Sequence, residues 1–252
     1  MYDLADFSLA DMVRCTAILR KIGTGANCME AVANRIVRHL YEHLLEAEAR
    51  RPACPLIRLF KTHPFGELDE DSRRFAATLA TEGPLRSDTP CLTLLASAGD
   101  RPEWNQRHQS KQYKAVPVTG LNFRDQFPMF SQLFTQFGID PAAAWAPDRD
   151  LLLDHNERTF GVFHVPVAVG SGYVPAQDRF VIPCGIRSVV GVGGLLPTAS
   201  VFALVLFSRV PISREQAELF RTIALAIKLA LLPFDGKAVL SPSPPIPCEE
   251  RL

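Results

Sequence analysis

The chain has 252 residues, of which 47% are hydrophobic and 21% charged, as is usual for a globular protein with a substantial core. Lys plus Arg and Asp plus Glu number 27 each, so the formal net charge is zero, which argues against nucleic acid or an anionic membrane as the main partner. The start of the chain has no cationic region followed by an apolar one, and glycines and Pro197 interrupt the most apolar run. The sequence therefore predicts neither a signal peptide nor a membrane span.

Cysteine usage indicates the redox compartment. Six cysteines occur, and none of them forms a Cys-x-x-Cys pair. In a chain of this size, this pattern favours reduced thiols over a disulfide framework. We therefore expect a cytoplasmic protein.

Two amphipathic helices are predicted before the first strand. Ser8 caps the first helix, which ends at Gly23, and its apolar stripe comprises Leu9, Met12, Val13, Thr16 and Leu19. Asn27 and Glu30 form a capping-box pattern for the second, which ends at Arg50-Arg51-Pro52 and whose buried face comprises Val32, Ile36, Leu40 and Leu44. Residues 1–26 are then a helical lead-in to the domain.

The middle of the chain alternates short strands with helical segments. Strands are predicted at 55–62, 91–97 and 159–165, helices at 69–80 and 127–137, and a helical turn at 175–182. Residues 101–120 form a long irregular excursion that contains Trp104, His108 and Tyr113. Long irregular segments inside compact domains tend to be functional or disordered.

The stretch from Cys184 to Phe234 has the clearest pattern. Residues 189–196 and 201–209 predict a hairpin, in which Gly191, Gly193 and Gly194 indicate a bulge or a close backbone approach. Ser213 and Gln216 predict a capped helix over 213–232. After Pro233, residues 235–252 predict a Pro-rich disordered tail.

This stretch resembles the end of a GAF domain: a small-residue turn into Ile186-Arg187-Ser188, two strands, and a closing helix that begins Pro-x-Ser-x-Glu-Gln. Residues 2–234 also resemble the sensory regions that precede PAS and histidine-kinase modules in bacterial signalling proteins. The resemblance implies an α+β fold over residues 1–234, with a central antiparallel sheet and helices packed on its faces.

The same resemblance implies a function. We expect a sensory module of a bacterial two-component system that binds a small ligand or a protein partner, such as a histidine kinase, and transmits through its terminal helices. The sequence contains no phosphoacceptor His motif, nucleotide-binding glycine boxes or receiver aspartates, so we expect neither an output domain nor enzymatic activity. The identity of the ligand, and of any cofactor, stays open.

Ligand-binding residues follow by analogy with where this fold holds ligands. The expected pocket wall and mouth comprise Phe160, Phe163, His164, Tyr173, Phe180, Cys184, Arg187 and Ser188. Arg187 has a planar guanidinium suited to an anionic ligand. The alternatives are an Arg that braces its turn by binding backbone carbonyls, aromatic residues that belong to the core, and a core histidine at His164.

Three other interpretations stay open. A GAF-fold thiol enzyme resembling free methionine sulfoxide reductases would use Cys91 and Cys184, although the cysteines are not clustered as in that family. His39 and His43 have a spacing that suits a metal, but without a third ligand surface solvation is favoured. A structural dimerisation module would form a homodimer through the terminal helices, using the apolar positions Leu225, Ala226 and Leu229 that the sheet leaves uncovered.

Overall fold

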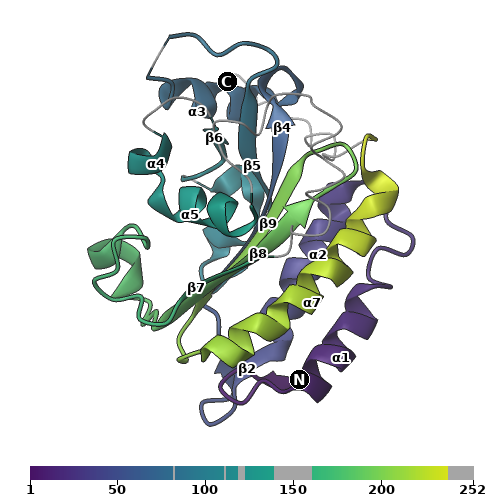
Figure 1. Cartoon of the computed structure of the whole chain (residues 1–252), viewed down its shortest axis with the longest axis vertical. Coiled ribbons are helices and arrows are strands. Elements are labelled where there is room, and N and C mark those ends of the chain that lie inside the picture. Colours follow the sequence, from purple (N-terminus) through teal and green to yellow (C-terminus); the bar gives the residue numbers. More distant parts are fainter. Residues whose placement is uncertain (82, 111, 119–122, 139–160, 238–252) are drawn as a thin grey trace, which may run out of the picture.

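The computed structural model of the chain describes residues 1–81, 83–110, 112–118, 123–138 and 161–237. Their centre is a six-stranded sheet with the order β6-β5-β4-β9-β8-β7, in which every pairing is antiparallel. Its strands are β4 (Leu56–Pro64), β5 (Pro90–Gly99), β6 (Ala115–Pro117), β7 (Val162–Val165), β8 (Ser188–Leu195) and β9 (Val201–Ser208). Helices lie on both faces of this sheet (Figure 1). The predicted α+β arrangement, a central antiparallel sheet with helices packed on its faces, is confirmed.

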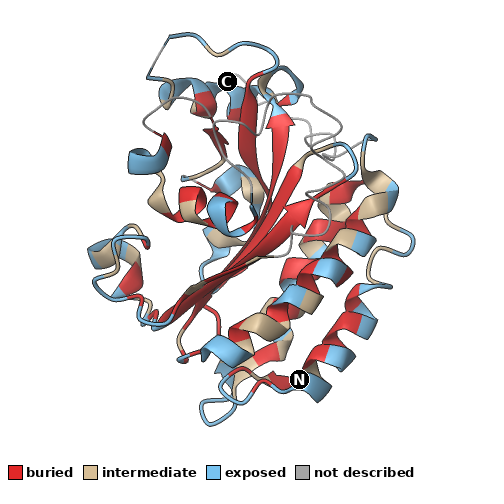
Figure 2. Ribbon diagram, viewed as in Figure 1, coloured by how far each residue is buried: buried red, intermediate tan, exposed pale blue. Residues whose placement is uncertain are grey.

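The two longest helices cover the first face. α2 (Met29–His43) and α7 (Arg214–Leu231) pack on the sheet, and α1 (Leu9–Leu19) packs against α7. The strands are buried except at Pro64 and, in part, His164, and each helix buries only the side that faces its neighbours (Figure 2). α7 begins with the predicted capping box: Gln216 N–H donates to Ser213 Oγ at 3.2 Å, and Ser213 N–H donates to Gln216 Oε1 at 2.8 Å.

The second face is covered by α4 (Phe123–Gln126) and the aromatic α5 (Pro128–Gln136). Two strand glycines make room for α5. A Cβ at Gly191 would lie 2.9 Å from Leu133 Cδ1, and one at Gly193 would lie 2.7 Å from the Phe137 ring. The predicted close backbone approach is therefore confirmed, and it explains glycine in the interior of a strand.

A second, small sheet was not predicted. β1 (Tyr2–Asp3), β2 (Leu44–Glu46) and β3 (Arg51–Pro52) pair in that order. The predicted continuation of the second helix to Arg50 is wrong, because the backbone of Leu44 and Leu45 pairs with β1.

Two details of the terminal helices differ from the predictions. The N-cap of α2 is Cys28 rather than Asn27, and Glu30 accepts a bond from Arg107 Nε at 2.9 Å instead of completing a capping box. On α1, Leu9 and Val13 are 63% and 56% exposed, and the buried side comprises Met12, Cys15, Thr16 and Leu19. The buried stripe is shifted because α1 contacts α7 along its other side.

The remaining elements are short. α3 (Glu70–Thr78) has Asp69 as its N-cap, and the 3₁₀ turns are η1 (Phe65–Glu67), η2 (Pro102–Trp104), η3 (Arg107–Gln109) and η5 (Leu232–Phe234). The predicted turn near 175–182 is η4 (Gln177–Val181), a single π-helical turn. The predicted tail lies outside the described residues beyond Lys237. Among the described residues, no helix combines the length and apolar character that a membrane crossing requires.

Candidate functional site

A cavity of about 610 Å³ lies on the second face of the sheet. Its floor consists of side chains from β4 and β9, and its walls come from α5, from the segment 101–113 and from the segment 175–180. The residues that line it are Leu56, Arg58, Phe60, Arg101, Glu103, Trp104, Gln109, Ser110, Gln112, Tyr113, Met129, Phe130, Pro175, Ala176, Arg179, Phe180 and Phe207. Its volume is in the range that holds a small organic ligand, roughly 300–1,000 Å³.

Aromatic rings dominate the lining and hold one another in place. Phe180 packs edge to face on Phe207, with ring centroids 4.9 Å apart, and on Trp104, at 5.6 Å. Phe130 makes the same kind of contact with Phe60 at 5.2 Å and with Tyr113 at 5.8 Å. This interlocked set gives the cavity a preformed apolar surface that suits a flat ring.

One cationic side chain lies on the cavity floor. Leu56, Arg58 and Phe60 alternate along β4, so they share the cavity face of the central strand. Arg58 is only 8% exposed, and its Nη2 donates to Ser110 Oγ at 3.3 Å. Its Nε has no hydrogen-bond partner, and within the part of the chain that the structure describes no carboxylate forms an ion pair with it.

The buried guanidinium is energetically costly. Burial lowers the pKa of Arg58 to about 10, so the group is still cationic at neutral pH. A desolvated charge without a counterion costs on the order of several kcal/mol. Ser97, which is opposite Arg58 on β5, is also buried, and its Oγ has no hydrogen-bond partner. On the cavity floor, the Arg58 Nε therefore has unused hydrogen-bonding capacity.

The rim of the cavity adds positive charge. Arg101 and Arg179 are exposed, and the Arg101 guanidinium lies 4.7 Å from the centre of the Trp104 ring. Counted with Arg58, the lining contains three arginines and one acidic residue, Glu103, so its formal charge is +2. A cleft with this balance concentrates anions.

Of the residues predicted to bind ligand, Phe180 lines this cavity. Phe163 is buried in the adjoining aromatic core, and its ring contacts Tyr173, with centroids 6.4 Å apart. Cys184 packs against the same core, and burial raises the pKa of its thiol. Phe160 lies outside the described residues.

The other predicted residues lie away from the cavity lining. His164 pairs with Val190, whose side chain belongs to the core under α2 and α7, and its Nε2 lies 2.9 Å from the Ile212 carbonyl. Burial lowers the pKa of His164. Arg187 is exposed, and Ser188 is buried and donates to the Val210 carbonyl at 2.8 Å. A ligand-binding role for these residues stays a prediction.

Sequence reasoning missed Arg58, although a signal was present. Within the run Leu56–Phe60 of β4, Arg58 is the one charged residue, and it shares a face with Leu56 and Phe60. Trp104 and Tyr113, by contrast, belong to the excursion 101–120 that the sequence marked as functional or disordered. In the structure, residues of that excursion form one wall of the cavity.

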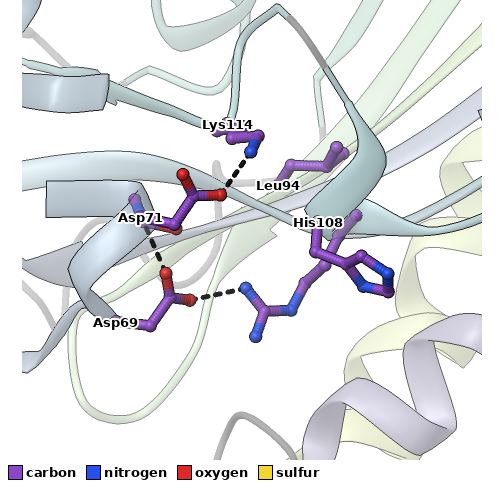
Figure 3. A pocket seen from close by; sticks show the side chains of 7 residues that line it. Asp69, Asp71, Leu94, His108 and Lys114 are labelled. Carbon is purple, nitrogen blue, oxygen red and sulfur yellow. Dashed lines mark hydrogen bonds and ion pairs between the residues drawn. The ribbon is translucent and has the colours of Figure 1, made fainter. Parts of the chain in front are cut away.

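The lining of a smaller hollow of about 60 Å³ includes two ion pairs, Arg107 with Asp69 and Lys114 with Asp71 (Figure 3). Arg107 bridges Glu30 of α2, at 2.9 Å, and Asp69 at the start of α3, at 2.6 Å, while Lys114 pairs with Asp71. Burial alone would raise the pKa of Asp69, but the Ser72 N–H and Arg107 hold that pKa below its usual range. These contacts tie α2, α3 and η3 together.

Within the described part of the chain, the cysteines and histidines do not form an assembled reactive set. Burial raises the pKa of Cys91 to about 12, and Cys91 belongs to a different apolar cluster from Cys184, so neither thiol is activated as a nucleophile. The His39 and His43 rings stack with centroids 4.2 Å apart. The described residues contain no group of three or more side chains able to hold a metal ion.

Comparisons with known proteins give similarity in fold alone. No protein-family model and no curated protein match the chain. Among solved structures, the chain is 11% identical to the GAF domain of an Acinetobacter phosphoenolpyruvate-protein phosphotransferase, covering 93% of this chain and 100% of that one with a TM-score of 0.47. It is 10% identical to an N-acylhomoserine-lactone-dependent LuxR-family transcription factor from Burkholderia cenocepacia, covering 90% and 99% with a TM-score of 0.45.

A third similarity is to free methionine-R-sulfoxide reductase from Neisseria meningitidis, at 10% identity, 90% and 89% coverage and a TM-score of 0.42. Since these proteins differ in function and the identities and TM-scores are low, we take no ligand, reaction or partner from them. The function has to be argued from the cavity.

Proposed function

We propose that the chain is a sensory module of GAF type that binds a small organic molecule in the 610 Å³ cavity. The observation that supports this most directly is the preformed aromatic lining, which faces a hollow instead of filling it. A structural dimerisation module would have no need of such a cavity. The raised pKa values of Cys91 and Cys184 argue against the thiol-enzyme alternative.

The route by which binding is transmitted follows from strand β4. Its cavity-facing side chains alternate with Ile57 and Leu59, which belong to the core shared with α2 and α7. A ligand that shifts β4 therefore changes the packing surface beneath the terminal helices. In this proposal, a histidine kinase or another signalling protein of a bacterial cytoplasm binds the terminal helices and responds to their altered packing.

The test uses N-phenyl-1-naphthylamine, a neutral aromatic dye whose fluorescence rises in apolar surroundings. We expect saturable binding at one site per chain, and we expect Met129→Trp to abolish it by filling the cavity, because Met129 lines the wall. Val167→Trp, at an exposed loop position outside the cavity lining, is the matched control and should bind like the unmodified chain. Unchanged dye affinity in a folded Met129→Trp variant would refute the proposed site.

A further inference from the structure

We infer that the cognate ligand is an organic anion with a flat aromatic body, whose acidic group binds the Arg58 guanidinium on the cavity floor. This inference rests on the proposed function and names the class of ligand that the cavity accepts. The observation that supports it is the presence of a buried cation and an aromatic lining in the same cavity.

The position of Arg58 suits a recognition residue. β4 is paired on both sides, with Ser97 of β5 and Val205 of β9 opposite Arg58, so its backbone is held rigidly. The guanidinium carries five N–H donors in a planar fork that matches the oxygens of a carboxylate or a related oxyanion. Ser110 takes a bond from one nitrogen, and Nε is left without a partner.

Two other classes of ligand would leave either the charge of the cavity or its aromatic surface without a partner. A neutral aromatic molecule would cover the rings but leave the buried charge of Arg58 unpaired. A small inorganic anion would pair with Arg58 but leave the faces around Trp104 and Phe180 uncovered. An aromatic anion satisfies both, and the exposed Arg101 and Arg179 at the rim attract it toward the entrance.

A pair of dyes with the same ring system tests the inference. 8-Anilinonaphthalene-1-sulfonate carries an acidic group that N-phenyl-1-naphthylamine lacks, so the ratio of their dissociation constants isolates the anion. Because a charge-assisted hydrogen bond in a buried site changes affinity by about 10-fold or more, we expect the sulfonate to bind at least about 10-fold more tightly. Arg58→Met should lower the ratio to about one, and Arg58→Lys, which keeps the charge but loses the fork, should give an intermediate ratio.

The matched control is Arg38→Met on the solvent side of α2, which removes an arginine far from the cavity lining and should leave the ratio unchanged. Thermal unfolding of each variant verifies that it is folded. A ratio near one in the unmodified chain, or a ratio that Arg58→Met does not change, would overturn the inference while leaving the proposed cavity standing. Absence of binding for both dyes would overturn the inference and the proposed function together.

Discussion

Arg58 links stability and binding in a single side chain. Its guanidinium is buried under the aromatic wall and, among the residues that the structure describes, donates a side-chain hydrogen bond to Ser110 alone. Buried groups of this kind remain in proteins where binding needs them and stability suffers for it. The ligand-free chain is therefore less stable than its apolar packing would allow.

We predict that Arg58→Met raises the free energy of unfolding of the ligand-free protein by about 1–3 kcal/mol, because it removes an uncompensated charge and keeps an unbranched chain of similar length. Urea denaturation of both proteins at pH 7.5 measures the change. A decrease of similar size in the free energy of unfolding would mean that Arg58 stabilises the cavity wall through its bond to Ser110 and is not an uncompensated charge.

His63 gives a second prediction, this time in pH. Burial, followed by the nearby charge of Lys61, lowers the pKa of His63 from 6.5 to about 3. Between these two values the unfolded chain takes up a proton that the folded chain does not, so the free energy of unfolding falls as the pH falls, and above pH 6.5 the effect vanishes. At pH 4.5, this difference in protonation lowers the free energy of unfolding by about 2–3 kcal/mol.

We expect His63→Leu to lose that part of the pH dependence. Urea unfolding gives the free energy of unfolding of both proteins at pH 7.5 and at pH 4.5. The decrease between the two pH values in the variant is then subtracted from the decrease in the unmodified chain. Equal losses would show that His63 is protonated in the folded state.

Among the elements, η3 depends on a charged anchor. Arg107 is about nine-tenths buried between the carboxylates of Glu30 and Asp69, and it lies two residues before the cavity residue Gln109. We predict that Arg107→Ala destabilises the protein by about 3 kcal/mol, since it removes the cation that binds two partly buried carboxylates. It should also weaken dye binding, because the cavity wall loses its attachment to α2 and α3.

Thermal unfolding and dye titration check both effects of Arg107→Ala. Arg74→Ala is the control, since its pair with Glu70 on α3 is exposed and such surface pairs contribute little. A loss of stability with unchanged dye affinity would separate the anchor from the cavity.

The elements that were predictable are those with local signals. The capping box of Ser213 and Gln216 and the helical period behind it place α7 to within one residue of the predicted range. β2 was missed because Leu44 and Leu45 continue the apolar period of α2, and it is the pairing with β1, far away in sequence, and with β3 that makes them a strand. Most of the cavity lining was missed for the same reason, since Arg58 and Trp104 meet Phe180, a predicted residue, only after the sheet is assembled.

At the scale of the whole molecule, self-association is a prediction that the structure leaves to experiment. Ala226 is buried, whereas Leu225 and Leu229 of α7 are 38% and 41% exposed. We predict that the chain forms a homodimer through the terminal helices and that Leu225→Glu with Leu229→Glu gives a monomer, because charges on this surface oppose its burial. Sedimentation equilibrium measures the mass, and an identical mass for both proteins would exclude this interface.

The strand order also limits the rate at which the protein folds. β4 and β9 are the two innermost strands, yet they stand at opposite ends of the sheet-forming part of the chain. During synthesis, β4, β5 and β6 emerge first and present the free edge of β4 until β9 arrives. Such long-range closure slows refolding to roughly milliseconds to seconds and leaves an apolar edge open to aggregation meanwhile. Newly made chains should consequently depend on chaperones more than their modest size suggests.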